Sequence, residues 1–186
     1  MSWRELSKHN RYIRGAAAAA LLGLISLGAG GCGFQPLYGS TSSGANLAEV
    51  MKTVDIATIG GRTGQRLRNE LLFGTTGGGA AAAPIYRLDV ALRETTRNTL
   101  VTQQGLATSQ ILELDAEYRL VRITDNEVVF KAWSNSQAAY NMVGSTGLAG
   151  STYGDTRAGL DAENRAARTL ADTIKTRLAA YLSGAA

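Results

Sequence analysis

Three acidic side chains come closest in this sequence to a catalytic pattern, because two carboxylates on one surface can hydrolyse a glycosidic bond. Glu113, Asp115 and Glu117 occupy alternate positions of one expected strand. Alternate residues on a strand face lie about 6.5–7 Å apart at the Cα, so the spacing permits such a pair. No neighbouring residue in the sequence marks one of them as a general acid. We therefore interpret the row as the solvated face of a strand.

Basic side chains form a second pattern that could bind a ligand. Arg87, Arg93 and Arg97 fall on one face of another expected strand, and Lys131 can join them from a later one. Guanidinium groups bind phosphates through two parallel hydrogen bonds, so these four residues are candidate ligands of a phosphorylated molecule. Ion pairs with Asp89 and with the acidic row are the alternative, because opposite charges on neighbouring strands pair readily.

Cys32 is the only cysteine of the 186 residues, and it ends a segment with the layout of a bacterial secretory signal. A basic cluster precedes an uncharged, mostly apolar run, which closes as Ala29-Gly30-Gly31-Cys32. This ending resembles a lipobox, so we expect removal of residues 1–31 and lipidation of Cys32. A transmembrane anchor is the alternative, but a span needs about 20 predominantly apolar residues, and residues 15–31 are too few and too rich in glycine.

Removal of this segment changes what the composition allows. The formal net charge of +4 becomes nearly neutral, since 15 basic and 14 acidic side chains remain, and nucleic acid is therefore not an expected partner. The only histidine, His9, also leaves with the segment. Without histidine, a Ser-His-Asp or Cys-His mechanism is excluded and the usual zinc ligands are missing. We expect no metal and no cofactor.

The eight residues that begin at Cys32, CGFQPLYG, resemble the start of mature members of the LPS-assembly lipoprotein (LptE) family. The resemblance implies a lipoprotein that is not an enzyme and that binds lipopolysaccharide during its export to the cell surface. It also implies a partner, the outer-membrane β-barrel LptD, which the lipoprotein helps to assemble and plugs from the periplasmic side. Gly33 follows the cysteine, where an aspartate would favour inner-membrane retention, so we expect anchoring in the outer membrane.

This resemblance gives the basic row a candidate ligand, because lipid A and the inner core of lipopolysaccharide carry phosphates. Arg87, Arg93, Arg97 and Lys131 are then candidate lipopolysaccharide-binding residues. Two alternatives from other classes remain. One is another periplasmic lipoprotein, such as an auxiliary subunit of a lipid-trafficking ABC transporter. The other is an envelope glycoside hydrolase that uses the strand carboxylates.

The elements that would position these residues begin after a polar tether at residues 40–46. We predict a strand over residues 50–59, a short helix over 62–73 and a low-complexity linker over 74–84. Strict alternation of apolar and polar residues then predicts strands over 85–101, 110–123 and 127–140, each with one buried face. Trp133 of the last strand could be an outward-facing anchor or part of the core, because the face it occupies is ambiguous.

The strongest helical pattern covers residues 156–182, where an apolar stripe repeats at spacings of three, four and seven. Asp155 or Thr156 would be its N-cap, and the glycine-rich residues 144–154 before it would be a loop. The predicted fold is an α+β two-layer sandwich with a four-stranded, mostly antiparallel sheet and two helices on one face. The domains would be the signal peptide 1–31, a lipidated tether 32–46 and one domain over 47–186.

Overall fold

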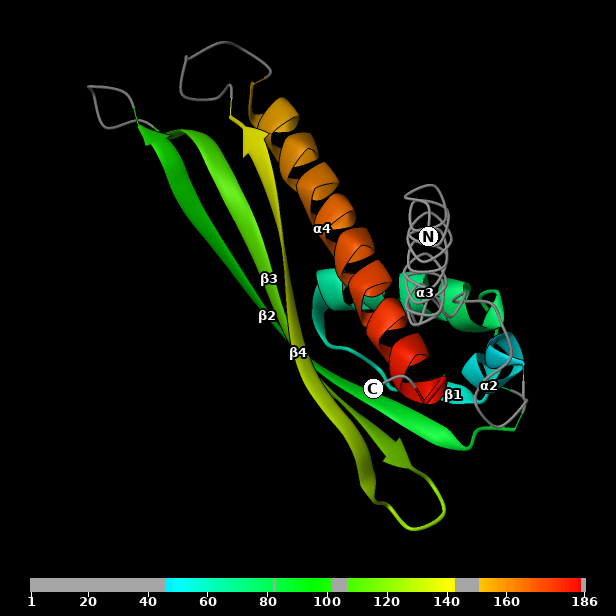
Figure 1. The fold of residues 1–186 in the computed structure, drawn as a ribbon. Coiled ribbons are helices and arrows are strands. Elements are labelled where there is room, and N and C mark those ends of the chain that lie inside the picture. Colours follow the sequence, from blue (N-terminus) through cyan, green and yellow to red (C-terminus); the bar gives the residue numbers. More distant parts are fainter. Residues whose placement is uncertain (1–45, 82, 102–106, 143–150, 185–186) are drawn as a thin grey trace, which may run out of the picture. The chain divides into compact units, whose positions relative to one another are not determined.

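The computed structural model describes residues 46–81, 83–101, 107–142 and 151–184. The expected signal peptide, Cys32 and the expected tether up to residue 45 lie outside these residues. Residues 102–106 and most of the loop expected over 144–154 lie outside them too. The described part is an α+β fold in which one sheet carries helices on one side (Figure 1), as the alternation of the strands predicts. The prediction of a two-layer fold is confirmed.

The predicted strand over residues 50–59 is correct only in its middle and wrong at both ends. Residues Leu47–Lys52 form a short helix, α2, and the first strand, β1, covers only Val54–Ile56. Asn46 caps the helix by accepting a hydrogen bond from the Ala48 N–H at 3.0 Å. Leu47 and Met51, one turn apart, are both buried. A cap and an apolar pair at helical spacing therefore decide the local structure against the alternation.

Helix α3 covers Gly61–Thr76 and is longer than predicted, so the first residues of the expected linker are helical. In its last turn, the Thr75 and Thr76 hydroxyls donate hydrogen bonds to carbonyls one turn earlier. The helix ends at Gly77, whose φ of 75° is a left-handed conformation that glycine adopts without steric cost. The backbone N–H of Gly77 bonds to the Leu72 carbonyl.

The four strands follow one another across the sheet in the order β1-β2-β3-β4. Strand β2 (Tyr86–Val101), β3 (Ala107–Arg122) and β4 (Val128–Asn141) form an antiparallel meander, as predicted. Strand β1 pairs in parallel with only the first residues of β2. Helix α3 connects the two, as parallel neighbours require a crossover.

The last helix, α4, covers Ser151–Leu182 and begins earlier than predicted. Asp155 and Thr156 therefore lie inside the helix and neither is its N-cap. The Thr156 hydroxyl donates to the Thr152 carbonyl at 2.9 Å, as a residue within a helix can. The glycine content before position 155 had suggested a loop, yet Gly154 is helical.

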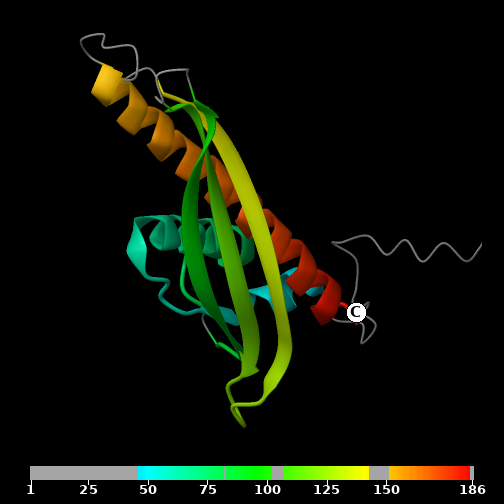
Figure 2. The ribbon, with the colours of Figure 1, turned by 90° about the vertical axis from the view of Figure 1, so that its left-hand side faces the viewer.

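The core lies between the sheet and the helices. Leu170, Ile174 and Leu178 of α4 are completely buried, as the apolar stripe predicts. Even-numbered side chains of the meander face them, and the buried ones include Leu88, Leu112, Leu114, Ala116, Tyr118, Leu120 and Ala138. Within the described residues three helices, instead of the two predicted, lie on this side of the sheet. Figure 2 looks onto the opposite side, with α3 and α4 behind the strands.

The open face of the sheet as candidate functional site

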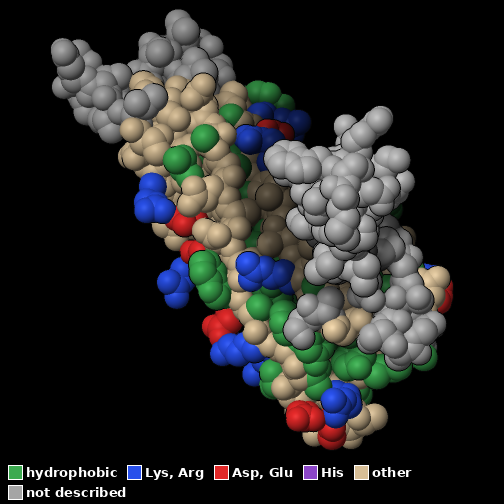
Figure 3. All heavy atoms as spheres, viewed as in Figure 1, with side chains coloured by type: hydrophobic (Ala, Val, Ile, Leu, Met, Phe, Trp, Pro, Cys, Tyr) green, Lys and Arg blue, Asp and Glu red, His purple; other side chains and the backbone are tan. Residues whose placement is uncertain are grey.

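The open face, the side of the sheet opposite the helices, gathers the charged residues that the sequence had singled out. Odd-numbered positions in the central part of the meander point to it, because successive side chains of a strand alternate between faces. Figure 3 shows this face only obliquely, and along its left margin cationic and acidic side chains lie next to one another. The cations are Arg87, Arg93, Arg97, Arg119 and Lys131, and the carboxylates are Asp89, Glu113, Asp115 and Glu117.

Three of the four predicted ligand residues form ion pairs on this face. The Arg87 Nε lies 3.0 Å from an Asp89 carboxylate oxygen, and the Lys131 Nζ lies 2.6 Å from Glu117. Arg97 pairs with Glu113 of the neighbouring strand. The alternative of ion pairs with Asp89 and with the acidic row therefore holds at these positions, within β2 for Arg87 and between strands for Arg97 and Lys131. All three cations are more than one-third exposed, so such pairs contribute little to stability.

Arg93 differs from the other three. It stands opposite Asp115 in the β2–β3 register, yet it forms no ion pair with any residue in the described part of the chain. Its side chain is exposed and lines a hollow of about 420 Å³ together with Trp133. The Trp133 side chain is 64% exposed, so it lies on the open face and not in the core. Arg93 thus offers an uncompensated guanidinium next to an aromatic surface.

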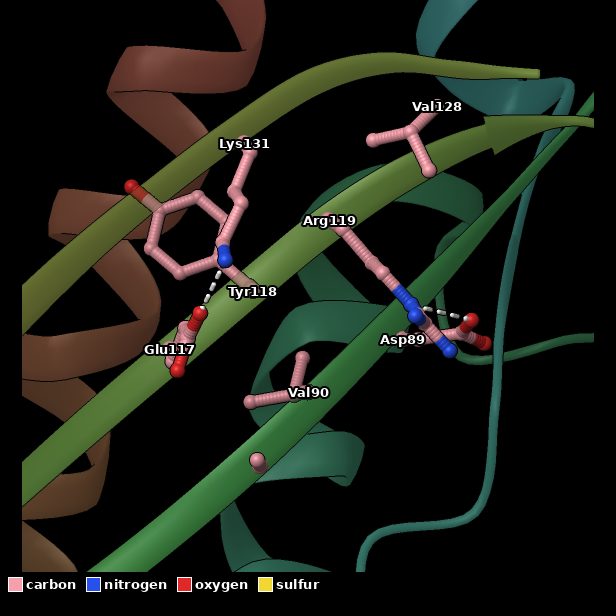
Figure 4. A pocket seen from close by; sticks show the side chains of 8 residues that line it. Asp89, Val90, Glu117, Tyr118, Arg119, Val128 and Lys131 are labelled. Atoms are coloured by element: carbon pink, nitrogen blue, oxygen red, sulfur yellow. Dashed lines mark hydrogen bonds and ion pairs between the residues drawn. The ribbon is translucent and has the colours of Figure 1, made fainter.

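A second hollow, of about 640 Å³, lies next to the first and is drawn in Figure 4. Two ion pairs flank it: Arg119 with Asp89 at 3.1 Å on one side, and Lys131 with Glu117 on the other. Arg119 is a member of the cluster that sequence reasoning missed as a candidate ligand. Arg119 is odd-numbered, like Glu113, Asp115 and Glu117 of the same strand. This shared position on the polar face was the signal that could have identified it.

The electrostatics at Glu117 are unlike those of the acid in a hydrolytic site. The hydrogen bond and the charge of Lys131 hold the pKa of Glu117 below its ordinary value. A glycoside hydrolase needs the opposite, a carboxylic acid whose pKa is raised so that it can donate a proton. Glu117 is therefore held in its ionised form, where it neutralises a neighbouring cation.

One end of the sheet is apolar, which the sequence analysis did not anticipate. Ile85, Ile123 and Val128 are exposed at the end where β3 turns into β4, and the Ile123 N–H bonds to the Ile85 carbonyl at 3.0 Å. Val128 lines the hollow of Figure 4 because an irregularity in the β3–β4 register changes the alternation before Phe130. The charged surface is thus continuous with an apolar one.

Two further findings concern metal sites and membrane spans in the described part of the chain. Over residues 46–184 with their gaps, no three His, Cys, Asp or Glu side chains gather in a way that could hold a metal ion. No helix among the described residues combines the length and the apolar character that crossing a membrane requires. What the open face presents is charge, one exposed tryptophan and an apolar end.

Comparison with known proteins gives one family. A family model described as LptE, lipopolysaccharide-assembly, matches residues 51–178, which span the sheet and most of α4. No curated protein matches the chain by sequence.

Several solved structures share the fold at low sequence identity. A lipoprotein from Caulobacter crescentus aligns with a TM-score of 0.60 and 20% identity, covering 74% of this chain and 96% of that one. The minor lipoprotein from Acinetobacter baumannii gives 0.50 and 18%, covering 71% and 95%. A lipoprotein B from Nitrosomonas europaea gives 0.52 and 12%, covering 71% and 84%. At these identities the likeness shows the fold alone.

Proposed function

Because this chain belongs to the LptE lipopolysaccharide-assembly family, we propose that it is a lipoprotein subunit of the lipopolysaccharide export machinery. In this proposal it assists assembly of the LptD β-barrel, plugs the barrel and binds lipopolysaccharide on its way to the cell surface. The observation that supports lipid binding is the open face of the sheet. There Arg93, which forms no ion pair among the described residues, lies beside the exposed Trp133.

The open face offers the two kinds of contact that a phosphorylated lipid needs. Arg93 and the ion-paired Arg87, Arg97 and Lys131 can bind phosphates, since guanidinium groups form bidentate hydrogen bonds with them. The exposed Ile85, Ile123 and Val128 at one end can contact acyl chains. A nearly neutral protein with such a local cluster attracts a phosphorylated lipid without binding polyanions in general.

The lipid anchor is the second part of the proposal. Signal cleavage before Cys32 and acylation of that residue would attach the domain to the periplasmic side of the outer membrane. One acyl chain gives only marginal membrane binding, so stable anchoring requires two or more. The polar residues 40–46 would then connect the lipidated end to the folded domain as a flexible tether.

Purification of the mature, lipidated protein with the LptD barrel from its own cells tests the main proposal. We expect a stable complex that survives washing in detergent, because a plug buried in a barrel shares a large surface with it. The matched control is the same purification with an unrelated lipoprotein. A chain that folds and is lipidated but does not retain the barrel contradicts the proposed function.

Lipopolysaccharide binding is tested by reversing charge on the open face. Changing both Arg93→Glu and Arg97→Glu should weaken binding of lipopolysaccharide at least tenfold at low salt, because phosphates would then face carboxylates. The difference should shrink as salt rises, since exposed charges are screened within about 8 Å at physiological ionic strength.

The control for this experiment is a double variant with the same charge change outside the sheet, Lys52→Glu with Arg157→Glu. Both residues are exposed and lie on helices α2 and α4. It should bind lipopolysaccharide as the wild type does. Unchanged binding by a folded Arg93→Glu, Arg97→Glu protein would remove the open face as the lipid site.

A further inference from the structure

We propose that the free edge of β2, residues 90–98, is the docking site for an extended segment of the barrel partner, which joins the sheet as an additional strand. This inference rests on the proposed function, because it names where the barrel contacts the lipoprotein. It goes beyond that function by assigning the contact to backbone hydrogen bonds at one edge of the sheet. Strand addition of this kind is a recurring way in which proteins recognise extended segments.

Strand β2 is covered by a neighbour on that side only at its beginning. Strand β1 pairs with Tyr86, Arg87 and Leu88, and the last bond is from the Ala57 N–H to the Leu88 carbonyl at 3.0 Å. Beyond Leu88 the strand continues to Val101 with no further strand beside it in the described part of the chain.

The direction of the unpaired groups follows from the same bond. In an antiparallel pair, residues alternate between pointing both backbone groups at the partner strand and pointing both away from it. The Leu88 carbonyl points away from β3, toward β1. Every second residue after Leu88 points its backbone groups the same way, away from β3. The N–H and C=O groups of these residues therefore form an open row that another strand can bind, at Val90, Leu92, Glu94 and Thr96.

The opposite edge of the sheet is protected, which makes the contrast informative. Arg177 of α4 donates to the Trp133 carbonyl of β4 at 2.7 Å, and Arg165 donates to the Ala139 carbonyl at 3.0 Å. Helix α4 runs along this side of the sheet (Figure 1). Natural proteins block exposed edges because unpaired strands bind other chains. Arginine side chains block part of the β4 edge, whereas no described residue is seen to block the β2 edge beyond Leu88 in this way.

The residues along the β2 edge favour pairing. Residues 90–98 contain no proline, and the first irregularity in the β2–β3 register comes after Asn98. Thr95 and Thr96 are β-branched and suit a strand. Neither a proline nor a bulge interrupts this segment, and the charged residues in it are Arg93, Glu94 and Arg97.

Charge indicates what kind of segment fits. Arg93 lies on the open face beside this edge without an ion pair in the described residues, so an incoming strand with a carboxylate opposite Arg93 would compensate it. A second copy of this chain is a poor occupant. Antiparallel pairing of two β2 edges would place Arg93 and Arg97 of both copies on one face and add cations where carboxylates are needed.

The substitution Thr96→Pro tests the edge without disturbing the sheet. The Thr96 N–H points away from β3, so proline removes one donor of the open row and no bond of the β2–β3 ladder. The matched control is Asn135→Pro at an outward position of β4, since it shares the alternation of Trp133 and Ala139. Circular dichroism and thermal unfolding of both variants establish that they are folded.

We expect the lipidated, full-length Thr96→Pro protein to bind the purified barrel at least tenfold more weakly than the wild type, and Asn135→Pro to bind within twofold of it. Hydrogen exchange gives a second measurement that needs no variant. In the wild-type complex, exchange of the Glu94 and Thr96 amides should slow at least tenfold, while exchange at Asn135 should not change.

Equal binding by Thr96→Pro, or exchange at residues 90–98 that the barrel does not slow, would overturn the docking site and leave the proposed function standing. Protection that grows with protein concentration in the absence of the barrel would assign the edge to self-association and would also overturn the inference. A wild-type protein that forms no complex with the barrel would overturn the proposed function, and the docking site with it.

Discussion

The two faces of the sheet are built from alternate residues of the same strands, yet they use opposite physical principles. The covered face buries leucine and alanine and satisfies its few polar groups: the Ser136 hydroxyl donates to the Ala166 carbonyl at 2.8 Å, and Tyr118 and Ser134 share a hydrogen bond at 3.1 Å. The open face carries exposed ion pairs that are worth little energetically. Stability is thus concentrated on one face, which leaves the other free to change for binding.

The largest test of this contrast is truncation on the covered face. Leu170→Ala or Ile174→Ala should lower the free energy of unfolding by about 2–5 kcal/mol, because each removes a completely buried side chain and leaves a cavity. Urea denaturation followed by circular dichroism measures the change. Arg168→Gln on the exposed side of the same helix is the control and should have a much smaller effect. Equal effects of the core and surface variants would show that α4 does not pack as described.

A smaller effect is expected from a buried polar contact on the same face. Ser136→Ala removes the hydroxyl that bonds to the Ala166 carbonyl of α4. The loss should be about 1 kcal/mol, the usual net contribution of one hydrogen bond. Ser134→Ala, at the next position on this face, removes the partner of Tyr118 and gives a comparison. A Ser136→Ala protein as stable as the wild type would show that packing alone holds α4 to β4.

The smallest effect is expected on the open face, at Glu117. Lys131 lowers the pKa of this carboxyl in the folded protein, so the pair's contribution is present above the unfolded pKa and is lost as pH falls through the folded pKa. Lys131→Ala should raise the pKa of Glu117 toward its ordinary value, as measured by carbon NMR of the carboxyl. The unfolding free energy at neutral pH should hardly change because the group is exposed. An unaltered Glu117 titration would show that the pair does not form in solution.

Most of the sheet could be predicted from the sequence because each long strand has one wet face. In β3 the apolar and charged residues alternate, which predicts both that the segment is a strand and which face is buried. The buried residues are Leu112, Leu114 and Ala116, and the charged ones between them are Glu113 and Asp115. Where the chain is short or buried on all sides, this signal fails. Residues 50–52 directly precede strand residues and are too few to show a period of their own. The Asn46 cap and the burial of Leu47 and Met51 accompany the helix that they form.

The candidate site was predicted as a face, but its internal arrangement was not. Parity places Arg87, Arg93 and Arg97 together, since all three have odd numbers on one strand. Which carboxylate each cation meets depends on the β2–β3 register, and the position of Val128 depends on an irregularity between β3 and β4. Both are set by contacts between segments distant in sequence. A single strand's pattern therefore cannot show that Arg93 forms no ion pair among the described residues.

The parallel pairing of β1 with β2 has a consequence for the order of folding. The β2–β3 and β3–β4 hairpins join segments close in sequence, and hairpins form within about 1–10 microseconds. Pairing β1 with β2 requires the intervening chain, including α3, to be placed first, and that loop-closure entropy makes such contacts slow. We therefore expect the three-stranded meander to form first and β1 to join it last. Strand β1 is the strand nearest in sequence to the proposed lipid anchor at Cys32. It would then be the last part of the sheet to assemble, and the first to open under tension applied from the amino-terminal end.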